Sequence, residues 1–465
     1  MQLPLAFAFA LWCHVSAPPH SPRTPVRSLR VQRTLRAQAE AAAEAEAAPG
    51  QSGNPGSTVP QSIGNLAKNI IGAGVLSLPA GLAAGTGLVP ALVLATFLGG
   101  FAGYAFNLVG RACDATGKRT FRELGLATRG PGLAKAMDYV CTTKTFVACL
   151  SYSLVIADSF SAIFSSFGVP PFFANRQVVL FGLTGCLLLP LCLLRNLSAL
   201  ANTSILGSAG MLYTTGFIVW RLLDGSYAPG GLYYDSLPAT MRPAFAGSLN
   251  LWSVNINTLV LVSALSTAFI AHYNAPKFYD QLSNRSVKRF STVVYVSFGI
   301  SILVYVTTMV AGYLTFGTAS QGLILNNYST HDPLATASRI AVGFAIVCTY
   351  PLAFSGLRDG VISIWGLQGK PVFNRLTVGL LGAITALAVV IRNVGFVNNL
   401  SGSLFGSSVI YIFPALLILS VLARSKRQNG FEGKVARVSI GCGVVLSLIG
   451  TVVAVLKEFA PKVLG

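Results

Sequence analysis

The chain has 465 residues, of which 53% are hydrophobic and only 10% are charged. Ordinary soluble domains carry about 25% charged residues, so this composition excludes a soluble globular enzyme and indicates a polytopic membrane protein. The net charge of +19 comes from short basic blocks between long apolar runs. Such blocks are typical of loops that orient membrane helices, so we expect contact with a lipid bilayer and not with nucleic acid.

The N-terminal residues form a separate segment. Residues 1–39 contain no Asp or Glu and five Arg, which is typical of an organellar transit peptide. They begin with an apolar run, Leu3 to Trp12, that is too short to span a bilayer but suits the core of a signal peptide. A signal peptide followed by a transit peptide resembles the two-part presequences of algae with secondary plastids. We therefore expect a targeting presequence and a plastid envelope location; the alternative is a disordered cytosolic tail and a vacuolar or plasma membrane location.

A linker and a membrane domain follow the presequence. Residues 40–60 are rich in Glu and Ala and then in Gly, Pro and Ser, so we expect no fold there. A membrane domain at 61–457 is filled by apolar runs of about 20 residues or more, enough to span a bilayer, and leaves 458–465 as a C-terminal tail. The eleven predicted helices lie near 61–84, 88–110, 133–166, 177–194, 198–221, 246–274, 291–314, 338–362, 376–393, 398–422 and 437–456.

The loops between these helices differ in charge. If the N-terminus lies on side one of the membrane, the Lys and Arg of the side-one loops outnumber those of the side-two segments by more than two to one. Basic residues concentrate on the cytosolic side of membrane proteins. Side one is therefore expected to face the cytosol, or the stroma or matrix of an organelle.

The first predicted helix is interrupted by glycine. Its sequence is Asn65-Leu-Ala-Lys-Asn-Ile-Ile-Gly-Ala-Gly-Val-Leu-Ser-Leu-Pro79. A glycine-broken membrane helix indicates a binding site near the bilayer midplane, where freed backbone groups line a cavity. The N-terminus of its second half would turn N–H groups toward an anionic group such as a carboxylate. A patch of small residues for close helix packing is the alternative.

Three segments of the chain resemble the amino acid/auxin permease family of sodium- or proton-coupled amino acid transporters. They are Asn65 to Pro79, Ala268-Phe-Ile-Ala-His-Tyr-Asn-Ala-Pro-Lys-Phe-Tyr-Asp-Gln-Leu282 and Ala311-Gly-Tyr-Leu-Thr-Phe-Gly317. The resemblance implies an all-α, 5+5 inverted-repeat (LeuT-like) transporter fold in which helices 1 and 6 are broken at the substrate site. Helix 6 offers no glycine between Leu259 and Ala275, so the residues themselves support its break poorly.

The resemblance also implies a substrate site. We expect substrate contacts from the glycine break and from neighbouring residues of helices 1 and 6, namely Asn69, Gly72, Ala73, Gly74, Ser266 and Phe269. A side chain at the break would hold a substrate carboxylate away from the backbone N–H groups. No intramembrane acidic residue marks a cationic substrate, so a neutral amino acid is the expected one.

Three residues bear on the coupling ion. In the sodium-coupled branch of the family, the position that matches Lys68 looks like an asparagine of the cation site, whereas the proton-coupled branch resembles this chain in having lysine there. The Lys68 ammonium would occupy the space of a sodium ion and repel one. Proton coupling or uniport is therefore expected, with sodium coupling as the alternative. Thr349 matches a hydroxyl position of that sodium site and could instead accept a hydrogen bond from Lys68. His272 could shuttle protons or pack as a structural histidine.

Two further charges lie in the third helix. Asp158 matches a family acidic position near the outer end and is expected to be paired. Lys144 has no role that the sequence assigns, and about 21 Å of helix separates it from Asp158.

The four histidines form no metalloprotease motif and no phosphate-binding loop is found, so neither an enzyme nor a cofactor is expected. A non-transporting amino acid sensor on the same fold is the alternative function.

Overall fold

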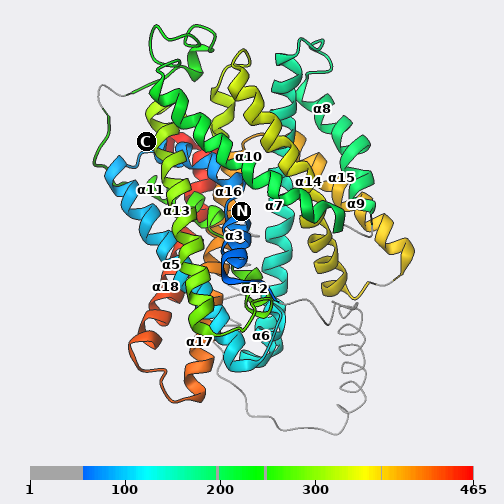
Figure 1. The fold of residues 1–465 in the computed structure, drawn as a ribbon, viewed down its shortest axis with the longest axis vertical. Coiled ribbons are helices and arrows are strands. Elements are labelled where there is room, and N and C mark those ends of the chain that lie inside the picture. Colours follow the sequence, from blue (N-terminus) through cyan, green and yellow to red (C-terminus); the bar gives the residue numbers. More distant parts are fainter. Residues whose placement is uncertain (1–55, 195–197, 246–248, 368, 464–465) are drawn as a thin grey trace.

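The computed structural model describes residues 56–194, 198–245, 249–367 and 369–463 (Figure 1). Its described residues form helices, with two isolated β-bridges and no named strand. The predicted presequence and most of the predicted linker lie outside the described residues. Thr58 caps the first helix through a reciprocal capping box with Gln61, and this helix begins at Val59, before the predicted domain boundary at residue 61.

The first half of the membrane domain has five helical segments at the predicted positions. The first segment is bent by 42° between Val59–Ile70 and Ala73–Ala83, and the fourth contains a π-helical turn. The segments are α3 (Val59–Ile70) with η1 (Ala73–Ser77) and α4 (Leu78–Ala83), α5 (Leu88–Thr116), α7 (Pro131–Ser166), α8 (Arg176–Leu183) with η2 (Thr184–Leu188) and α9 (Leu189–Leu193), and α10 (Ser198–Leu223). A short helix, α6 (Phe121–Arg129), joins α5 to α7.

The second half again begins with a broken segment. Its segments are α11 (Thr258–Ala268) with η4 (His272–Asn274) and α12 (Ala275–Asp280), α13 (Val287–Phe316), α14 (Pro333–Trp365), α15 (Lys370–Val390), α16 (Val394–Ser401) with η6 (Gly402–Ile412) and α17 (Phe413–Arg424), and α18 (Phe431–Phe459). Short 3-10 turns lie at η3 (Ala239–Met241), η5 (Ile324–Asn327) and η7 (Pro461–Val463). Helix α18 extends slightly into the predicted tail, 458–465.

The count of membrane helices is close to the prediction without confirming it. In the described part of the chain, nine helices are long and apolar enough to cross a membrane, and the bent pair makes ten. The fifth predicted span coincides with α10, whose 26 residues correspond to about 39 Å of helix. The predicted number of eleven stays a prediction.

The sixth predicted span, 246–274, is wrong at its start, because α11 begins at Thr258. The residues before Thr258 pair instead with the start of α5: the N–H groups of Gly87 and Leu88 donate to the carbonyls of Ser253 and Asn250 at 2.8 and 3.0 Å. These backbone bonds hold the segment in a non-helical conformation, although its apolar composition suggested a helix.

The tenth membrane helix (helix 10: α16, η6 and α17) packs closely against the sixth (helix 6: α11, η4 and α12). A Cβ on Gly402, at the start of η6, would lie 1.7 Å from the carbonyl oxygen of Ser263 in α11, and one on Gly406 would lie 2.9 Å from the Cβ of Ser266. Only glycine permits this approach. Element η6 is π-helical over Gly402–Ile412, a geometry that is rare in proteins.

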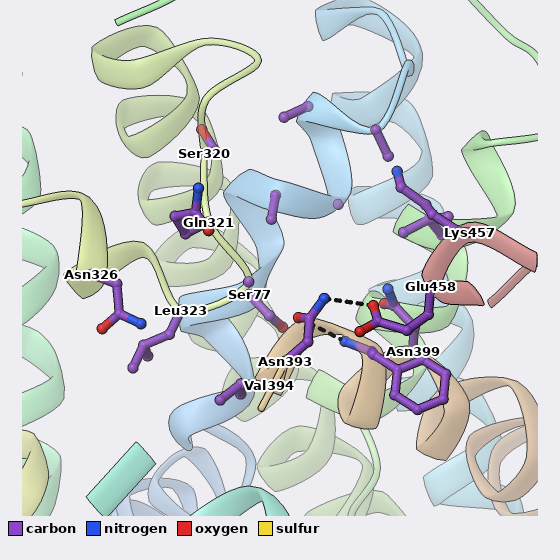
Figure 2. A pocket seen from close by; sticks show the side chains of 18 of the residues that line it. Ser77, Ser320, Gln321, Leu323, Asn326, Asn393, Val394, Asn399, Lys457 and Glu458 are labelled. Carbon is purple, nitrogen blue, oxygen red and sulfur yellow. Dashed lines mark hydrogen bonds between the residues drawn. The ribbon is translucent and has the colours of Figure 1, made fainter. Parts of the chain in front are cut away.

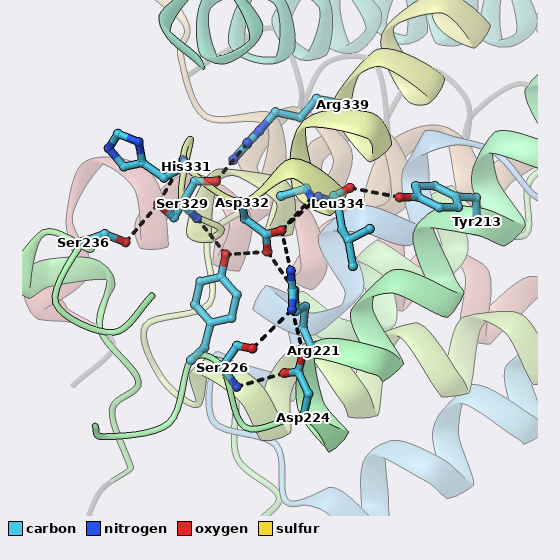
Figure 3. A network of polar contacts seen from close by, with 12 residues as sticks. Tyr213, Arg221, Asp224, Ser226, Ser236, Ser329, His331, Asp332, Leu334 and Arg339 are labelled. Carbon is cyan, nitrogen blue, oxygen red and sulfur yellow. Dashed lines mark hydrogen bonds and ion pairs between the residues drawn. The ribbon is translucent and has the colours of Figure 1, made fainter. Parts of the chain in front are cut away.

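A buried ionic network closes the side-two end of helices α10 and α14 (Figure 3). Arg221 donates two hydrogen bonds to Asp332, at 2.9 and 2.7 Å, and a third to Asp224 at 2.6 Å. The hydroxyl of Tyr227 also donates to Asp332, at 3.0 Å. Burial and the Asp332 carboxylate raise the pKa of the Tyr227 phenol, which therefore remains a proton donor. The network fixes the loop after α10 to the start of α14.

Candidate functional site

The break in helix 1 follows from its glycines. Helix α3 ends at Ile70, and Ile71 (ψ 94°) and Gly72 (φ −127°, ψ −173°) are extended before η1 begins. Gly72 has no side chain to cap η1, and the first N–H groups of a helix have no partner within it. The backbone N–H groups at Ala73 and Gly74 therefore mark the positive end of the second half-helix.

The break in helix 6 is present although the segment lacks glycine. Helix α11 ends at Ala268, and the chain resumes at η4 and then at α12, which has Pro276 in its first turn. Proline is favoured in the first turn of a helix, where its missing N–H would have no partner, so Pro276 is a sequence signal for the start of α12. It does not by itself locate the break, because α14 continues through Pro351.

One tyrosine joins the two breaks. The hydroxyl of Tyr305, in α13, lies 2.6 Å from the carbonyl oxygen of Ile70 and 2.8 Å from that of Ala268. These are the carbonyls at the ends of α3 and α11, and the Tyr305 side chain is fully buried. The backbone N–H of Gly72 interacts with the same hydroxyl oxygen. A single O–H therefore serves helix ends from both halves of the fold.

The glycines of the first break have different surroundings. A Cβ on Gly74 would contact the Cα of Ala268 at 3.4 Å, whereas one on Gly72 would meet only the carbonyl of Ile70, at 3.9 Å. Gly74 thus packs against helix 6, and Gly72 borders open space. Ala73 between them is partly exposed.

The other predicted substrate residues divide into two groups. Asn69 is exposed, and its side-chain oxygen accepts a hydrogen bond from Asn274 of η4 at 3.2 Å, so it lies beside both breaks. Ser266 is buried against helix 10 and donates to the carbonyl of Val262 at 2.9 Å. The ring of Phe269 is buried and lies 4.8 Å from that of Tyr305. The last two side chains contact protein and do not face the open space at Gly72.

The three predicted coupling residues do not form one cluster. Lys68 is partly exposed, and no hydrogen bond or ion pair joins it to another described residue. The Thr349 hydroxyl donates to the carbonyl of Ala345 in its own helix at 2.8 Å, not to a group on helix 1. His272 is fully buried, its Nε2 lies 2.9 Å from the carbonyl of Ala102, and its Nδ1 has no described partner.

A cavity of about 470 Å³ opens on side two, above the breaks (Figure 2). Asp158 lies in its wall and is ion-paired with Arg176 at 2.6 Å, as the expected pairing requires. Asn326 donates to the other carboxylate oxygen of Asp158 at 3.1 Å. Further lining residues are Ser77, Gly81, Asn393, Asn399, Lys457 and Glu458.

A buried polar layer separates this cavity from the breaks. The Ser77 hydroxyl donates to the carbonyl of Gly74 at 2.9 Å and accepts from Asn398 at 3.3 Å. Ser151 of α7 donates to Asn398 at 2.9 Å, so helices 1, 3 and 10 are linked. On the side-one half of helix 1, Asn65 and Asn69 are exposed on one helical face. A layer of hydrogen-bonded polar side chains thus lies between the break and the side-two cavity, and exposed polar groups lie on its side-one half.

Comparison with known proteins identifies relatives over most of the chain. The family model for transmembrane amino acid transporter protein matches residues 55–456. A putative sodium-coupled neutral amino acid transporter 11 of Danio rerio is 27% identical over 407 residues, covering 86% of this chain and 87% of that protein. Amino acid transporter AVT6E of Arabidopsis thaliana is 26% identical over 423 residues, covering 86% and 83%.

Solved structures share the fold. MhsT in complex with L-phenylalanine is similar with a TM-score of 0.53 at 14% identity, over 84% of this chain and 98% of that one. Inward-facing Mhp1 is similar with a TM-score of 0.56 at 13% identity, over 87% and 90%. These likenesses confirm the predicted all-α, LeuT-like fold. The protein is an integral membrane transporter, not an enzyme, and it belongs to the transmembrane amino acid transporter family.

Proposed function

We propose that the protein is a secondary active transporter that moves an amino acid by alternating access and does not require sodium. The observation that carries this proposal is the pair of helix breaks joined at Tyr305, with Gly72 bordering open space between them. Backbone N–H groups at a half-helix N-terminus suit a carboxylate. A neutral amino acid is the substrate expected from the sequence, and two kinds of relative carry "neutral amino acid" in their names.

Sodium independence rests on Lys68. Its ammonium lies one helical turn before the break, and no described carboxylate pairs with it. A fixed positive charge repels a sodium ion held nearby in the same low-dielectric site. Proton coupling or uniport is therefore the proposed mode, although relatives are named sodium-coupled. A sensor without transport activity would show no uptake at all after reconstitution into liposomes.

The break glycine gives a direct test of the site. Because a Cβ on Gly72 would approach only the carbonyl of Ile70, at an ordinary contact distance of 3.9 Å, Gly72→Val should fold normally yet fill the space that the substrate carboxylate needs. We expect uptake to be abolished while expression is maintained. Gly100→Val is the matched control, since Gly100 is exposed on α5 and has no neighbour within 4 Å. Normal uptake by the Gly72 variant would remove this residue from the site.

Tyr305→Phe tests the junction of the two breaks. It deletes the O–H while keeping the ring, and leaves two buried carbonyls without their donor. We expect a loss of stability of about 1–3 kcal/mol, together with slower uptake. Thermal unfolding in detergent and initial uptake rates provide the measurements. Tyr139→Phe, at an exposed tyrosine of α7, is the control; equal behaviour of the two variants would contradict the role of Tyr305.

Replacement of sodium by choline tests the coupling ion. Initial uptake into proteoliposomes at fixed pH should be unchanged, because Lys68 supplies the positive charge that sodium would supply. If Lys68 also releases its proton during the cycle, uptake rises with an inward proton gradient and Lys68→Ala removes that dependence. A large loss of uptake in choline would contradict sodium independence and indicate that uptake is coupled to sodium.

We also propose that residues 1–59 direct the protein to an organelle membrane, most simply a plastid envelope. The support is the acid-free, arginine-bearing start of the chain. A fluorescent fusion of residues 1–59 should accumulate at plastids in an algal cell. A fusion that stays diffuse in the cytosol would contradict this location. A glycan at Asn327 is not expected in either case, because this side chain is fully buried and bonded to the backbone of Gln321 and Ala319.

A further inference from the structure

Lys144 is a cation deep in the membrane domain that the proposed mechanism does not use. It lies in α7, about 20 Å along the helix axis from Pro131. An ionisable side chain at this depth is costly unless it pairs or borders a water-filled path, and such residues usually take part in function. Lys144 keeps part of its side chain exposed in the described structure, and its polar contact is with the break of helix 6.

The side chain of Lys144 contacts the break of helix 6. Its Nζ donates to the hydroxyl of Tyr273 at 3.1 Å and lies 4.6 Å from the centre of that ring. Tyr273 belongs to η4, directly after the break. The next residue, Asn274, donates to Asn69 of helix 1 at 3.2 Å. Lys144 therefore reaches the same junction of helices 1 and 6 that borders the proposed substrate site.

No negative charge balances this ammonium in the described part of the chain. The titratable groups that face it are Tyr273, Tyr152 and Cys141, all of which are neutral in their ordinary state. The two acidic residues of α7 have other partners: Asp138 pairs with Arg122 at 3.1 Å, and Asp158 with Arg176 at 2.6 Å.

The hydrogen-bonding capacity of Lys144 is also incomplete. An ammonium has three N–H donors, and the contact with Tyr273 uses one of them. Lys68, the other lysine near the breaks, is likewise without a carboxylate partner among the described residues. The side-one half of the breaks thus carries two positive charges with unused N–H donors that an anionic group would satisfy.

We propose that Lys144 is a specificity-determining residue that binds a carboxylate on the substrate side chain. Acidic amino acids are then transported alongside neutral ones, and cationic ones are excluded by repulsion. The α-carboxylate is held at the backbone of the helix 1 break, and the second carboxylate reaches the ammonium beside Tyr273. This inference rests on the proposed transport function and narrows its substrate class.

The test uses the purified full chain in proteoliposomes with labelled L-alanine, L-glutamate and L-lysine. The wild-type protein should take up glutamate and alanine but not lysine, and glutamate should compete with alanine uptake. Lys144→Gln should lower the ratio of glutamate to alanine kcat/KM about 10-fold or more, the expected effect of losing one charge-assisted hydrogen bond. Lys144→Arg should keep the preference. Lys135→Gln, at an exposed lysine of the same helix, should leave the ratio unchanged.

Three results would overturn the inference. The first is a glutamate-to-alanine ratio in Lys144→Gln equal to that of the wild type. The second is wild-type uptake of lysine at the rate of glutamate, which needs no variant and so does not depend on how well a variant folds. The third is a loss of proton-gradient dependence in Lys144→Gln with selectivity intact. An absence of uptake of every amino acid would instead refute the proposed function.

Discussion

The hydroxyl of Tyr305 lies within hydrogen-bonding distance of carbonyls at the ends of two broken helices. In a bilayer, every backbone polar group must find a partner within the protein, and a broken helix leaves carbonyls that no longer have one. Tyr305 supplies a donor to Ile70 of helix 1 and to Ala268 of helix 6. Because the hydroxyl has one proton, it cannot make a full hydrogen bond to both carbonyls at the same moment. The junction is thus a point where small shifts of either half-helix exchange one bond for the other.

This junction places the proposed substrate site in a defined position across the membrane. Toward side two, Ser77, Asn398 and Ser151 form a buried polar layer beneath the cavity of about 470 Å³. Toward side one, exposed polar residues lead to the break. Alternating access requires such a site to be reached from one side at a time. The buried Arg221–Asp332 pair holds the loop after α10 to the start of α14.

The sequence predicted the elements that depend on local chemistry. The break of helix 1 was predicted correctly because Gly72 and Gly74 carry the necessary backbone freedom within a few residues of each other. The break of helix 6 was expected only from the family resemblance, because Pro276 is a signal for the start of α12 and does not by itself locate the break. The early start assigned to helix 6 was wrong because apolar composition cannot show that Ser253 and Asn250 pair with the backbone of α5.

The contacts between distant segments could not be predicted in the same way. Nothing near Tyr305 in the sequence connects it to Ile70, 235 positions away. The helical phase of Ser266 and Phe269 depends on where the helix breaks and on the close approach of Gly406, so their burial against protein was not foreseen. The contact between Lys144 and Tyr273 could not be predicted, because it depends on how α7 packs beside η4.

The most direct test of the central claim is a cryo-electron microscopy map of the full chain in nanodiscs with a transported amino acid bound. We predict ligand density between the two breaks, with the α-carboxylate within hydrogen-bonding distance of the N–H groups at Ala73 and Gly74. Ligand density confined to the side-two cavity among Asp158, Asn393 and Lys457, with the breaks closed, would contradict it.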